Sequence, residues 1–287
     1  MSTRSLGSVD TARALDTGPP SGPDPEAGAS SLRLAGATVA YGDKVVLEEL
    51  DVAVPQGVFT AVIGPNGCGK STMLRTLART LRPRAGTALL DGRPLGRWRS
   101  KAIARRLALL PQDPVVPEGI TVGALVARGR HPYHSPLRQW LPGDQAAVAQ
   151  AMVATGVEQL AEDPVSGLSG GQRQRVWIAM ILAQDTEYVL LDEPTSFLDV
   201  SHQIEVLHLC QDMRDQGRTV LTVLHDLNHA ARYAEHLMVM DEGRIVAAGD
   251  PVEVLTEQLV AEVFGLPAEI AADPQSGTPM VVPLRRD

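Results

Sequence analysis

The sequence predicts an α/β fold with a parallel β-sheet at its core, and three observations support this prediction. Short apolar runs rich in β-branched residues, typical of buried parallel strands, precede helical patterns, as at residues 58–63. A glycine-rich segment, GPNGCGKST, joins that run to a helical pattern at residues 64–72. The acidic pair Asp192-Glu193 directly follows another apolar run, at residues 188–191. Because ligands of open α/β sheets bind at the carboxyl ends of strands, we expect these segments to mark binding sites.

The beginning of the chain differs in composition from the rest. Residues 1–30 are rich in Pro, Gly, Ser, Ala and Asp. A segment of this composition cannot bury enough apolar surface to become ordered, so we predict a disordered tail there. The alternating pattern LRLAGATVAY then predicts a strand that starts at Leu32. A second β-rich section continues to about Pro55.

The segment at residues 64–72 fits the P-loop pattern G-x-x-x-x-G-K-[ST]. A strand precedes it at residues 58–63, and we expect the following helix to end at Arg82-Pro83. The apolar face of that helix carries Met73, Leu74, Leu77 and Leu81. A glycine-rich turn that binds nothing is the alternative, but strand, loop and helix in this order favour a phosphate site.

The P-loop residues have distinct predicted roles. Glycines allow successive backbone N–H groups to approach a phosphate, and the helix N-terminus adds a favourable dipole. We predict that Lys70 contacts the β- and γ-phosphates and that Ser71 binds Mg²⁺, which makes ATP and Mg²⁺ the expected cofactors. The residues predicted to bind the nucleotide here are Gly64, Pro65, Asn66, Gly67, Cys68, Gly69, Lys70, Ser71 and Thr72.

Cys68 lies within this loop, close to the start of a helix and to Lys70. Both neighbours favour a thiolate, so we expect a lowered pKa and alkylation that ATP prevents. The second cysteine is Cys210, and two cysteines do not form a disulfide framework, which indicates a reducing cytosol.

The acidic pair after the run at residues 188–191 supplies the other part of a metal site. We predict that Asp192 binds Mg²⁺ and that Glu193 is the base that orients and deprotonates the attacking water. A solvated turn is the alternative because Pro194 follows at once, but the P-loop earlier in the chain favours the catalytic role.

A second possible anion site is LSGGQ at residues 168–172, where a serine and two glycines open the helical pattern RQRVWIAMILAQ. This segment resembles the signature motif of ATP-binding cassette (ABC) ATPases, and the resemblance extends over about residues 31–260. It implies that Tyr41 stacks on adenine, that Gln112 is the Q-loop glutamine and a metal ligand, that Asp199 ends the D-loop SFLD, and that His225 contacts the γ-phosphate. A strand-end aromatic and a surface histidine are the alternative interpretations of Tyr41 and His225.

The resemblance also implies the architecture. An ABC ATPase has a P-loop NTPase core of the RecA-like type, an antiparallel β subdomain and an inserted helical subdomain. We assign residues 31–266 to this domain, about 113–171 to the helical subdomain and 267–287 to a short extension. In the family two such domains pair head to tail, so Ser169, Gly170, Gly171 and Gln172 are expected to contact the ATP of a second copy.

The remaining elements follow from local patterns. Helices are predicted in VGALVARG and DQAAVAQAMVATG, and strands near residues 188–192, 219–224 and 236–240. A turn at residues 241–244 is expected to lead into the final strand, and helical structure to end near Leu266.

Composition limits the partners. The net charge of −8 and a pI of about 5.4 do not favour a nucleic-acid partner. No apolar run approaches the roughly 18 residues of a membrane-spanning helix, so a membrane role requires separate transmembrane subunits. The expected assembly is a homodimer with two permease subunits, served by a substrate-binding lipoprotein, at the cytoplasmic face of the cell membrane.

The segment ARGRHPY at residues 127–133 resembles the GRxP segment of ATPases that serve ferric-siderophore, haem and cobalamin importers. We therefore predict an ATP-hydrolysing subunit for iron-siderophore import, with haem, cobalamin or another metal chelate as alternative substrates. A non-transport ABC ATPase is a further alternative. His131 and His134 are interpreted as surface residues that face the permease rather than as a metal site.

Overall fold

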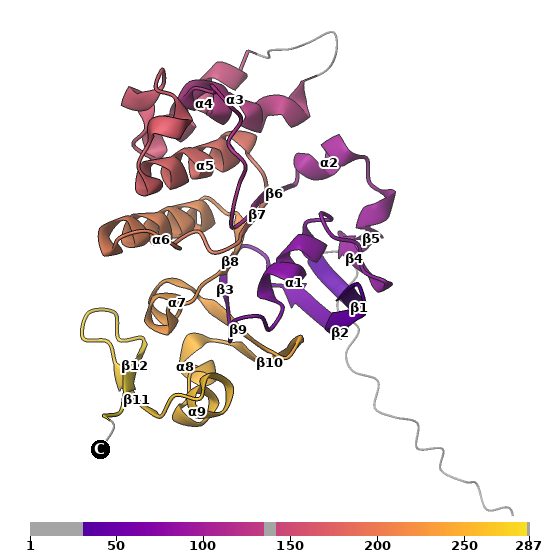
Figure 1. Ribbon diagram of the computed structural model, residues 1–287, viewed down its shortest axis with the longest axis vertical. Coiled ribbons are helices and arrows are strands. Elements are labelled where there is room, and N and C mark those ends of the chain that lie inside the picture. Colours follow the sequence, from indigo (N-terminus) through magenta and orange to yellow (C-terminus); the bar gives the residue numbers. More distant parts are fainter. Residues whose placement is uncertain (1–30, 135–141, 286–287) are drawn as a thin grey trace, which may run out of the picture.

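A computed structural model describes residues 31–134 and 142–285 of the chain (Figure 1). The tail expected at residues 1–30 lies outside the described residues. In the described ranges, no helix has both the length and the apolar character needed to cross a membrane.

The central six-stranded sheet confirms the predicted parallel core. Its strand order is β10-β9-β3-β8-β7-β6, and only the β10–β9 pair is antiparallel. The strands are β3 (Phe59–Ile63), β6 (Leu107–Leu110), β7 (Tyr188–Leu191), β8 (Thr219–Val223), β9 (His236–Asp241) and β10 (Arg244–Gly249). Every residue of β3, β7 and β8 is buried, because helices or the second sheet cover both faces.

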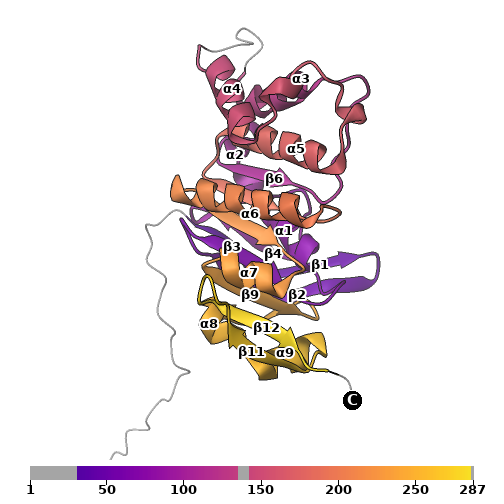
Figure 2. The same cartoon turned by 90° about the vertical axis from the view of Figure 1, so that its left-hand side faces the viewer.

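Alternate residues of β3 belong to two different cores. Phe59, Ala61 and Ile63 pack in the cluster that includes α6 (Val200–Asp215) and α7 (Leu227–Tyr233). Val62 points to the other side, where the cluster includes α1 (Lys70–Leu77) and the second sheet. The sheet is therefore the middle layer of the molecule, and Figure 2 shows α6 and α7 in front of it.

The second sheet is antiparallel, with the order β2-β1-β4-β5. Its strands are β1 (Leu32–Tyr41), β2 (Lys44–Val54), β4 (Ala85–Leu90) and β5 (Arg93–Pro94). β1 has the bounds expected from its alternating pattern, with Leu32, Leu34, Ala37 and Val39 in the core shared with α1.

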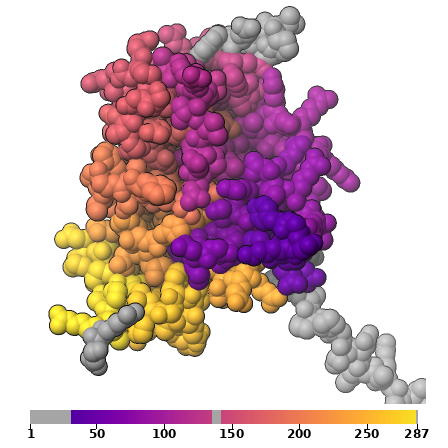
Figure 3. All heavy atoms as spheres, in the orientation of Figure 1, coloured from indigo at the N-terminus to yellow at the C-terminus, as the bar shows by residue number. Residues whose placement is uncertain are grey.

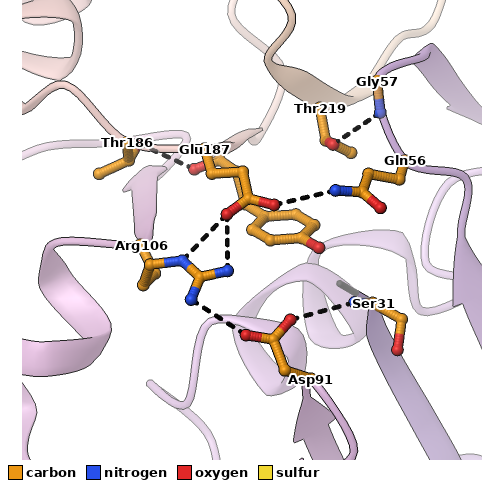
Figure 4. A network of polar contacts seen from close by, with 9 residues as sticks. Ser31, Gln56, Gly57, Asp91, Arg106, Thr186, Glu187 and Thr219 are labelled. Atoms are coloured by element: carbon orange, nitrogen blue, oxygen red, sulfur yellow. Dashed lines mark hydrogen bonds and ion pairs between the residues drawn. The ribbon is translucent and has the colours of Figure 1, made fainter. Parts of the chain in front are cut away.

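One network of polar contacts joins the two sheets (Figure 4). It lies at the starts of β6 and β7, whereas the P-loop follows the end of β3. Arg106, just before β6, donates to Glu187 Oε2 at 2.6 and 3.0 Å and lies 3.0 Å from Asp91 Oδ2. Gln56 donates to Glu187 Oε1 at 3.0 Å, and the Ser31 backbone N–H donates to Asp91 at 3.2 Å. The network fixes the turn after β4 against the starts of β6 and β7.

A helical layer covers one end of the core, at the top of Figures 1 and 2. It consists of α3 (Val122–Ala127), η2 (Arg128–Tyr133), α4 (Asp144–Ala154), η3 (Glu158–Leu160), η4 (Val165–Gly167) and α5 (Gly170–Gln184). Helices were expected at the positions of α3, α4 and α5. The short helices η1 (Leu95–Arg97) and α2 (Ser100–Ala104) connect β5 to β6.

Two expectations are wrong, one about where α1 ends and one about which strand is the last. α1 ends at Leu77 rather than at Arg82-Pro83, because Arg79 adopts a left-handed backbone conformation with φ 60° that breaks the helix. Leu81 therefore lies outside the helix whose apolar face it was expected to extend.

The strand after the 241–244 turn, β10, is also not the last one. After α8 (Pro251–Val254) and α9 (Glu257–Phe264), β11 (Ala268–Ala272) and β12 (Pro279–Pro283) form an antiparallel hairpin. Asn228 of α7 holds this hairpin, since its side chain accepts from the Val281 N–H at 2.7 Å and donates to the Val281 carbonyl at 3.3 Å.

Candidate functional site

The P-loop connects β3 to α1, and two of its glycines are required by close contacts. Gly64 has φ 151°, and a Cβ there would lie 2.0 Å from the Met240 carbonyl oxygen. Gly69 has φ 109°, and a Cβ there would lie 2.8 Å from Leu47. The loop therefore wraps closely against β2 and β9, and larger residues at these positions would open it.

Lys70 is buried at the start of α1, with 5% of its surface exposed. Its ammonium group donates to the carbonyl oxygens of Gly64 and Pro65, each at 2.8 Å. A cavity of about 240 Å³ lies over the loop and is lined by Val46, Asn66, Gly67, Gly69, Lys70, Ser71, Thr72 and Glu193. Backbone N–H groups, a fixed cation and a carboxylate thus meet in one small space suited to a phosphate chain.

Asp192 and Ser71 form the part of the site that suits a metal ion. Ser71 Oγ donates to Asp192 Oδ1 at 2.8 Å, and Asp192 is 1% exposed. Burial raises the pKa of the Asp192 carboxyl, while the hydrogen bond from Ser71 and the charge of Arg75 act in the opposite direction. Asp192 Oδ2 has no hydrogen-bond donor within the described residues, and Arg75 Nε lies 3.9 Å from it.

That buried oxygen is the test of whether the residues fit Mg²⁺. Mg²⁺ prefers oxygen ligands and is held in proteins by one or two carboxylates together with substrate phosphates. Asp192 Oδ2 and the Ser71 hydroxyl, placed beside the cavity over the P-loop, meet this requirement. The donor set therefore fits Mg²⁺.

Two of the predicted site residues, Gln112 and His225, meet at Glu193. Gln112 Nε2 donates to Glu193 Oε2 at 2.7 Å, and His225 Nε2 lies 2.8 Å from Glu193 Oε1. Ser196 Oγ also donates to Oε2, at 3.0 Å. Glu193 has a left-handed φ of 53°, a conformation that is unfavourable for a side chain and that surrounding contacts must maintain. The structure places Gln112 on Glu193, while Asp192 is bonded to Ser71.

Sequence reasoning did not select Ser196 and Arg75 as site residues. Ser196 belongs to the quoted SFLD segment, but nothing in its spacing shows that its hydroxyl turns back to Glu193. Arg75 lies one helical turn after Ser71, and this spacing could have placed it on the face of α1 toward Asp192.

The LSGGQ segment forms the start of α5. Ser169 Oγ accepts from the Gln172 N–H at 3.2 Å, and Gln172 Oε1 accepts from the Ser169 N–H at 3.0 Å, so the two residues form a capping box. At Gly171 a Cβ would lie 2.9 Å from the His202 ring, so α5 begins directly against α6. Gly170 is the first residue of α5. None of these residues lines the cavity over the P-loop.

The other residues of the D-loop and the aromatic position lie at the surface. Asp199 caps α6, accepting from the His202 N–H and the Ser201 hydroxyl at 3.1 and 2.9 Å, and these bonds lower the pKa of its carboxyl. Phe197, two residues earlier, is 97% exposed. Tyr41 ends β1 and is 47% exposed, outside the cavity lining.

The expectation that Cys68 has a lowered pKa is wrong. The thiol is 7% exposed, and burial raises its pKa. The charge of Lys70, whose Nζ lies 3.9 Å from Sγ, lowers it by less. The sequence showed the nearby cation but not the burial, which has the larger effect.

The GRHP segment makes a buried ion pair. Arg130 Nε lies 2.8 Å from Asp144 Oδ1, and its guanidinium lies 4.0 Å from the centre of the Tyr133 ring. His134 Nε2 lies 2.9 Å from Asp144 Oδ2, so this histidine has the carboxylate neighbour that sequence reasoning did not assign to it. His131 is exposed, and within the described residues no three His, Cys, Asp or Glu side chains are grouped to hold a metal ion.

Residues 47–196 match the family described as ABC transporter. The chain is 52% identical over 250 residues to the ferric enterobactin transport ATP-binding protein FepC of Escherichia coli (strain K12), covering 87% of this chain and 92% of that protein. It is 45% identical over 243 residues to the iron(3+)-hydroxamate import ATP-binding protein FhuC of Bacillus subtilis (strain 168), covering 84% and 90%. It is 41% identical over 275 residues to the hemin import ATP-binding protein HmuV of Rhodococcus jostii (strain RHA1), covering 96% and 92%.

Solved structures agree with this likeness. A chain of a transporter described as of the metal-chelate type, in an inward-facing conformation, superposes with a TM-score of 0.76 at 28% identity, over 89% of this chain and 98% of that chain. CbiO1 from Clostridium perfringens, part of the ABC transporter complex cbiONQ, superposes with a TM-score of 0.68 at 30% identity, over 80% and 92%.

Proposed function

The chain belongs to the ABC transporter family and is an ATPase, and from this premise we propose that it powers the import of a ferric siderophore. The observation that carries the catalytic part is the convergence of Gln112, Ser196 and His225 on Glu193 beside the P-loop cavity. The part that concerns import rests on relatives named for ferric enterobactin and iron(3+)-hydroxamate transport.

In this proposal the P-loop holds the triphosphate of ATP, and Lys70 leaves the carbonyls of Gly64 and Pro65 to contact the β- and γ-phosphates. Asp192 and Ser71 hold Mg²⁺, which when bound neutralises charge that develops on the phosphates. Arg75 balances the buried charge of Asp192 from the other side.

Glu193 is proposed to accept the proton of the attacking water. Its two oxygens are fixed from opposite sides, Oε1 by His225 and Oε2 by Gln112 and Ser196, so the carboxylate is oriented before the substrate arrives. His225 is also proposed to contact the γ-phosphate, so that the position of the base depends on the presence of the phosphate that the water attacks.

We propose that the second half of each site comes from another copy of the chain. Ser169, Gly170, Gly171 and Gln172 lie outside the cavity of their own P-loop, and they open a fifteen-residue helix whose N-terminus favours an anion. Tyr41 is proposed to stack on adenine, and Asp199 to lie at the junction of the two copies. A homodimer would contain two such composite sites.

The proposed assembly contains two transmembrane permease subunits and is served by a substrate-binding lipoprotein, with this chain at the cytoplasmic face of the membrane. Relatives named as import ATP-binding proteins and the cbiONQ complex support a permease partner. Haem is the second candidate substrate, because a relative named for hemin import aligns with 96% of this chain.

The decisive experiment compares uptake of radiolabelled ferric enterobactin, ferric hydroxamate and haemin by a deletion strain, the complemented strain and a strain that carries Glu193→Gln. We expect the wild-type gene to restore uptake of a ferric siderophore and Glu193→Gln to abolish it. Restored uptake of haemin alone would replace the siderophore by haem, and unchanged uptake of all three compounds in the deletion strain would refute the import function.

A further inference from the structure

The charge of the chain is distributed unevenly. Residues 75–106 contain ten of its 26 Lys and Arg residues but only one of its 34 Asp and Glu residues. This segment therefore has a formal charge of +9 in a chain whose net charge is −8. It covers the end of α1, the strands β4 and β5, and the short helices η1 and α2.

Most of these cations lie at the surface without an acidic partner. Two of the ten pair with carboxylates, Arg75 with the buried Asp192 and Arg106 with the partly exposed Asp91 and Glu187. We define the basic surface by Arg79, Arg82, Arg93, Arg97, Arg99, Lys101 and Arg105. All but the partly buried Arg79 are exposed, and in the described part of the chain no carboxylate oxygen lies within 4.0 Å of their charged nitrogens.

Contacts to Trp98 and to η2 position four of these cations. Around Trp98, Arg79 donates to the backbone carbonyl at 2.9 Å and the Arg93 guanidinium lies 5.4 Å from the ring centre. Beyond α2, Lys101 donates to the His134 carbonyl at 2.7 Å and Arg105 to the Pro132 carbonyl at 2.9 Å. In Figure 3 the purple side chains of this part of the chain project from one side of the molecule.

The cations are also ordered before any partner binds. Backbone carbonyls and aromatic rings hold several of them in place, which reduces the conformational entropy that a partner would have to overcome, and they leave the positive charge unneutralised. A cavity of about 280 Å³, lined in part by Arg79, Arg82 and Leu95, opens within the surface. These features fit a partner that carries many negative charges.

We propose that the basic surface binds the anionic phospholipid headgroups of the membrane beside the permease. The location follows from the proposed function, because the surface continues onto η2 of the helical layer, which is expected to face the membrane partner. The cations are spread over several elements and do not converge on one point, which suits a plane of separate phosphates better than one acidic side chain. The remaining chain, at −17, is repelled by an anionic membrane and would keep this side turned toward it.

The test measures binding of the purified full chain to vesicles by flotation. One vesicle type contains phosphatidylcholine alone and the other phosphatidylcholine with phosphatidylglycerol. The variant R97Q/R99Q removes two exposed charges whose side chains make no hydrogen bond in the described structure, and R244Q/R285Q is the control with the same change in net charge elsewhere. Thermal unfolding of each variant checks that it is folded.

We expect wild type to bind the phosphatidylglycerol vesicles but not phosphatidylcholine alone, and to dissociate as salt is raised. R97Q/R99Q should bind roughly 25-fold more weakly, about fivefold for each charge, while R244Q/R285Q should stay within about twofold of wild type. Equal binding to both vesicle types, or equal binding of the two variants, would overturn the proposal. Binding to a polyglutamate peptide without binding to vesicles would also overturn it, in favour of an acidic protein segment.

This assay needs neither the permease nor ATP turnover. If the purified wild-type chain does not bind the vesicles but its gene restores siderophore uptake, only the lipid contact is therefore rejected. If the purified chain binds the vesicles but the deletion strain takes up all three compounds normally, only the import function is rejected.

Discussion

At the residue scale, the position of Glu193 gives the most direct prediction. Glu193→Gln keeps the shape of the side chain and its contacts to Ser196 and His225 but removes the basic oxygen. We expect kcat for ATP hydrolysis to fall by about 10²–10⁴-fold, the range for loss of a general base, with little change in ATP affinity. Steady-state ATPase assays and fluorescent-nucleotide binding measure the two quantities separately.

Glu242→Gln is the matched control for that substitution. Glu242 is an exposed glutamate that also has a left-handed φ, of 42°, and lies in the turn between β9 and β10. Its replacement should leave both kcat and ATP affinity within about twofold of wild type. A Glu193→Gln enzyme as active as this control would remove Glu193 from the catalytic role.

The two cysteines give a prediction about pH. Burial raises the pKa of Cys68, and it raises the pKa of Cys210 to about 12. Only the thiolate reacts with iodoacetamide, and a raised pKa moves thiolate formation to higher pH, so Cys68 should react more slowly than a small free thiol at neutral pH. The rate should rise with pH.

The measurement is mass spectrometry of Cys210→Ser, in which Cys68 is the only cysteine. A labelling rate at neutral pH equal to that of a free thiol would show that the charge of Lys70 outweighs burial. Protection by ATP remains the expected result, because the thiol lies inside the loop that surrounds the phosphates.

At the scale of elements, the C-terminal hairpin depends on Asn228. Asn228→Ala leaves the N–H of Val281, a residue that is 5% exposed, without its acceptor, so we expect a loss of about 1–2 kcal/mol in the free energy of unfolding. Asn228→Asp keeps the acceptor and loses the donor, and should lose less. Urea denaturation measures both.

A suitable control is Gln258→Ala, which removes only an exposed hydrogen bond to Glu262 on α9. Its effect should stay within about 0.5 kcal/mol. If Asn228→Ala were no more destabilising than this control, the hairpin would be held by other contacts.

The strands of the core could be predicted from the sequence because helices or the second sheet cover both faces, which makes β3, β7 and β8 unbroken apolar runs. The end of α1 could not, since Leu81 continues the helical spacing and no glycine or proline marks the break at Arg79. β11 is a short AEIAA pattern with little β propensity, and its pairing with β12 depends on a contact to α7 far away in the chain.

The candidate site, too, could be predicted only in part. The sequence placed Ser71 and Asp192 at one site, because both follow strands of one parallel sheet. It did not show that Gln112 and Ser196 share one oxygen of Glu193, since loop conformations after β6 and β7 decide which side chains meet.

At the scale of the whole molecule, the network in Figure 4 joins the two sheets, and its central ion pair should stabilise the protein. The side chains of Arg106 and Glu187 are 31% and 29% exposed, whereas those of Arg244 and Glu48 are 68% and 65% exposed. A double-mutant cycle with alanine should give a coupling energy of about 1 kcal/mol or more for the first pair and below about 0.5 kcal/mol for the second. Equal coupling in the two pairs would show that the partly buried pair stabilises the protein no more than the exposed one.

Assembly gives the last prediction. If α5 of one copy completes the phosphate site of another, blocked hydrolysis should hold two copies together. Light scattering of Glu193→Gln with ATP and Mg²⁺ should show a dimer that EDTA dissociates. A mass that stays that of one chain under these conditions would refute the shared site.

The buried pair of Arg130 and Asp144 has a mechanical consequence. Arg130 also donates to the Ala183 carbonyl at 2.9 Å, so one side chain connects η2 and α4 to the C-terminal end of α5. α5 has fifteen residues and is about 22 Å long, and its opposite, N-terminal end is capped by Ser169. We therefore expect a displacement of η2 to move α5 as a rigid unit, and so to shift Ser169 at its N-terminus.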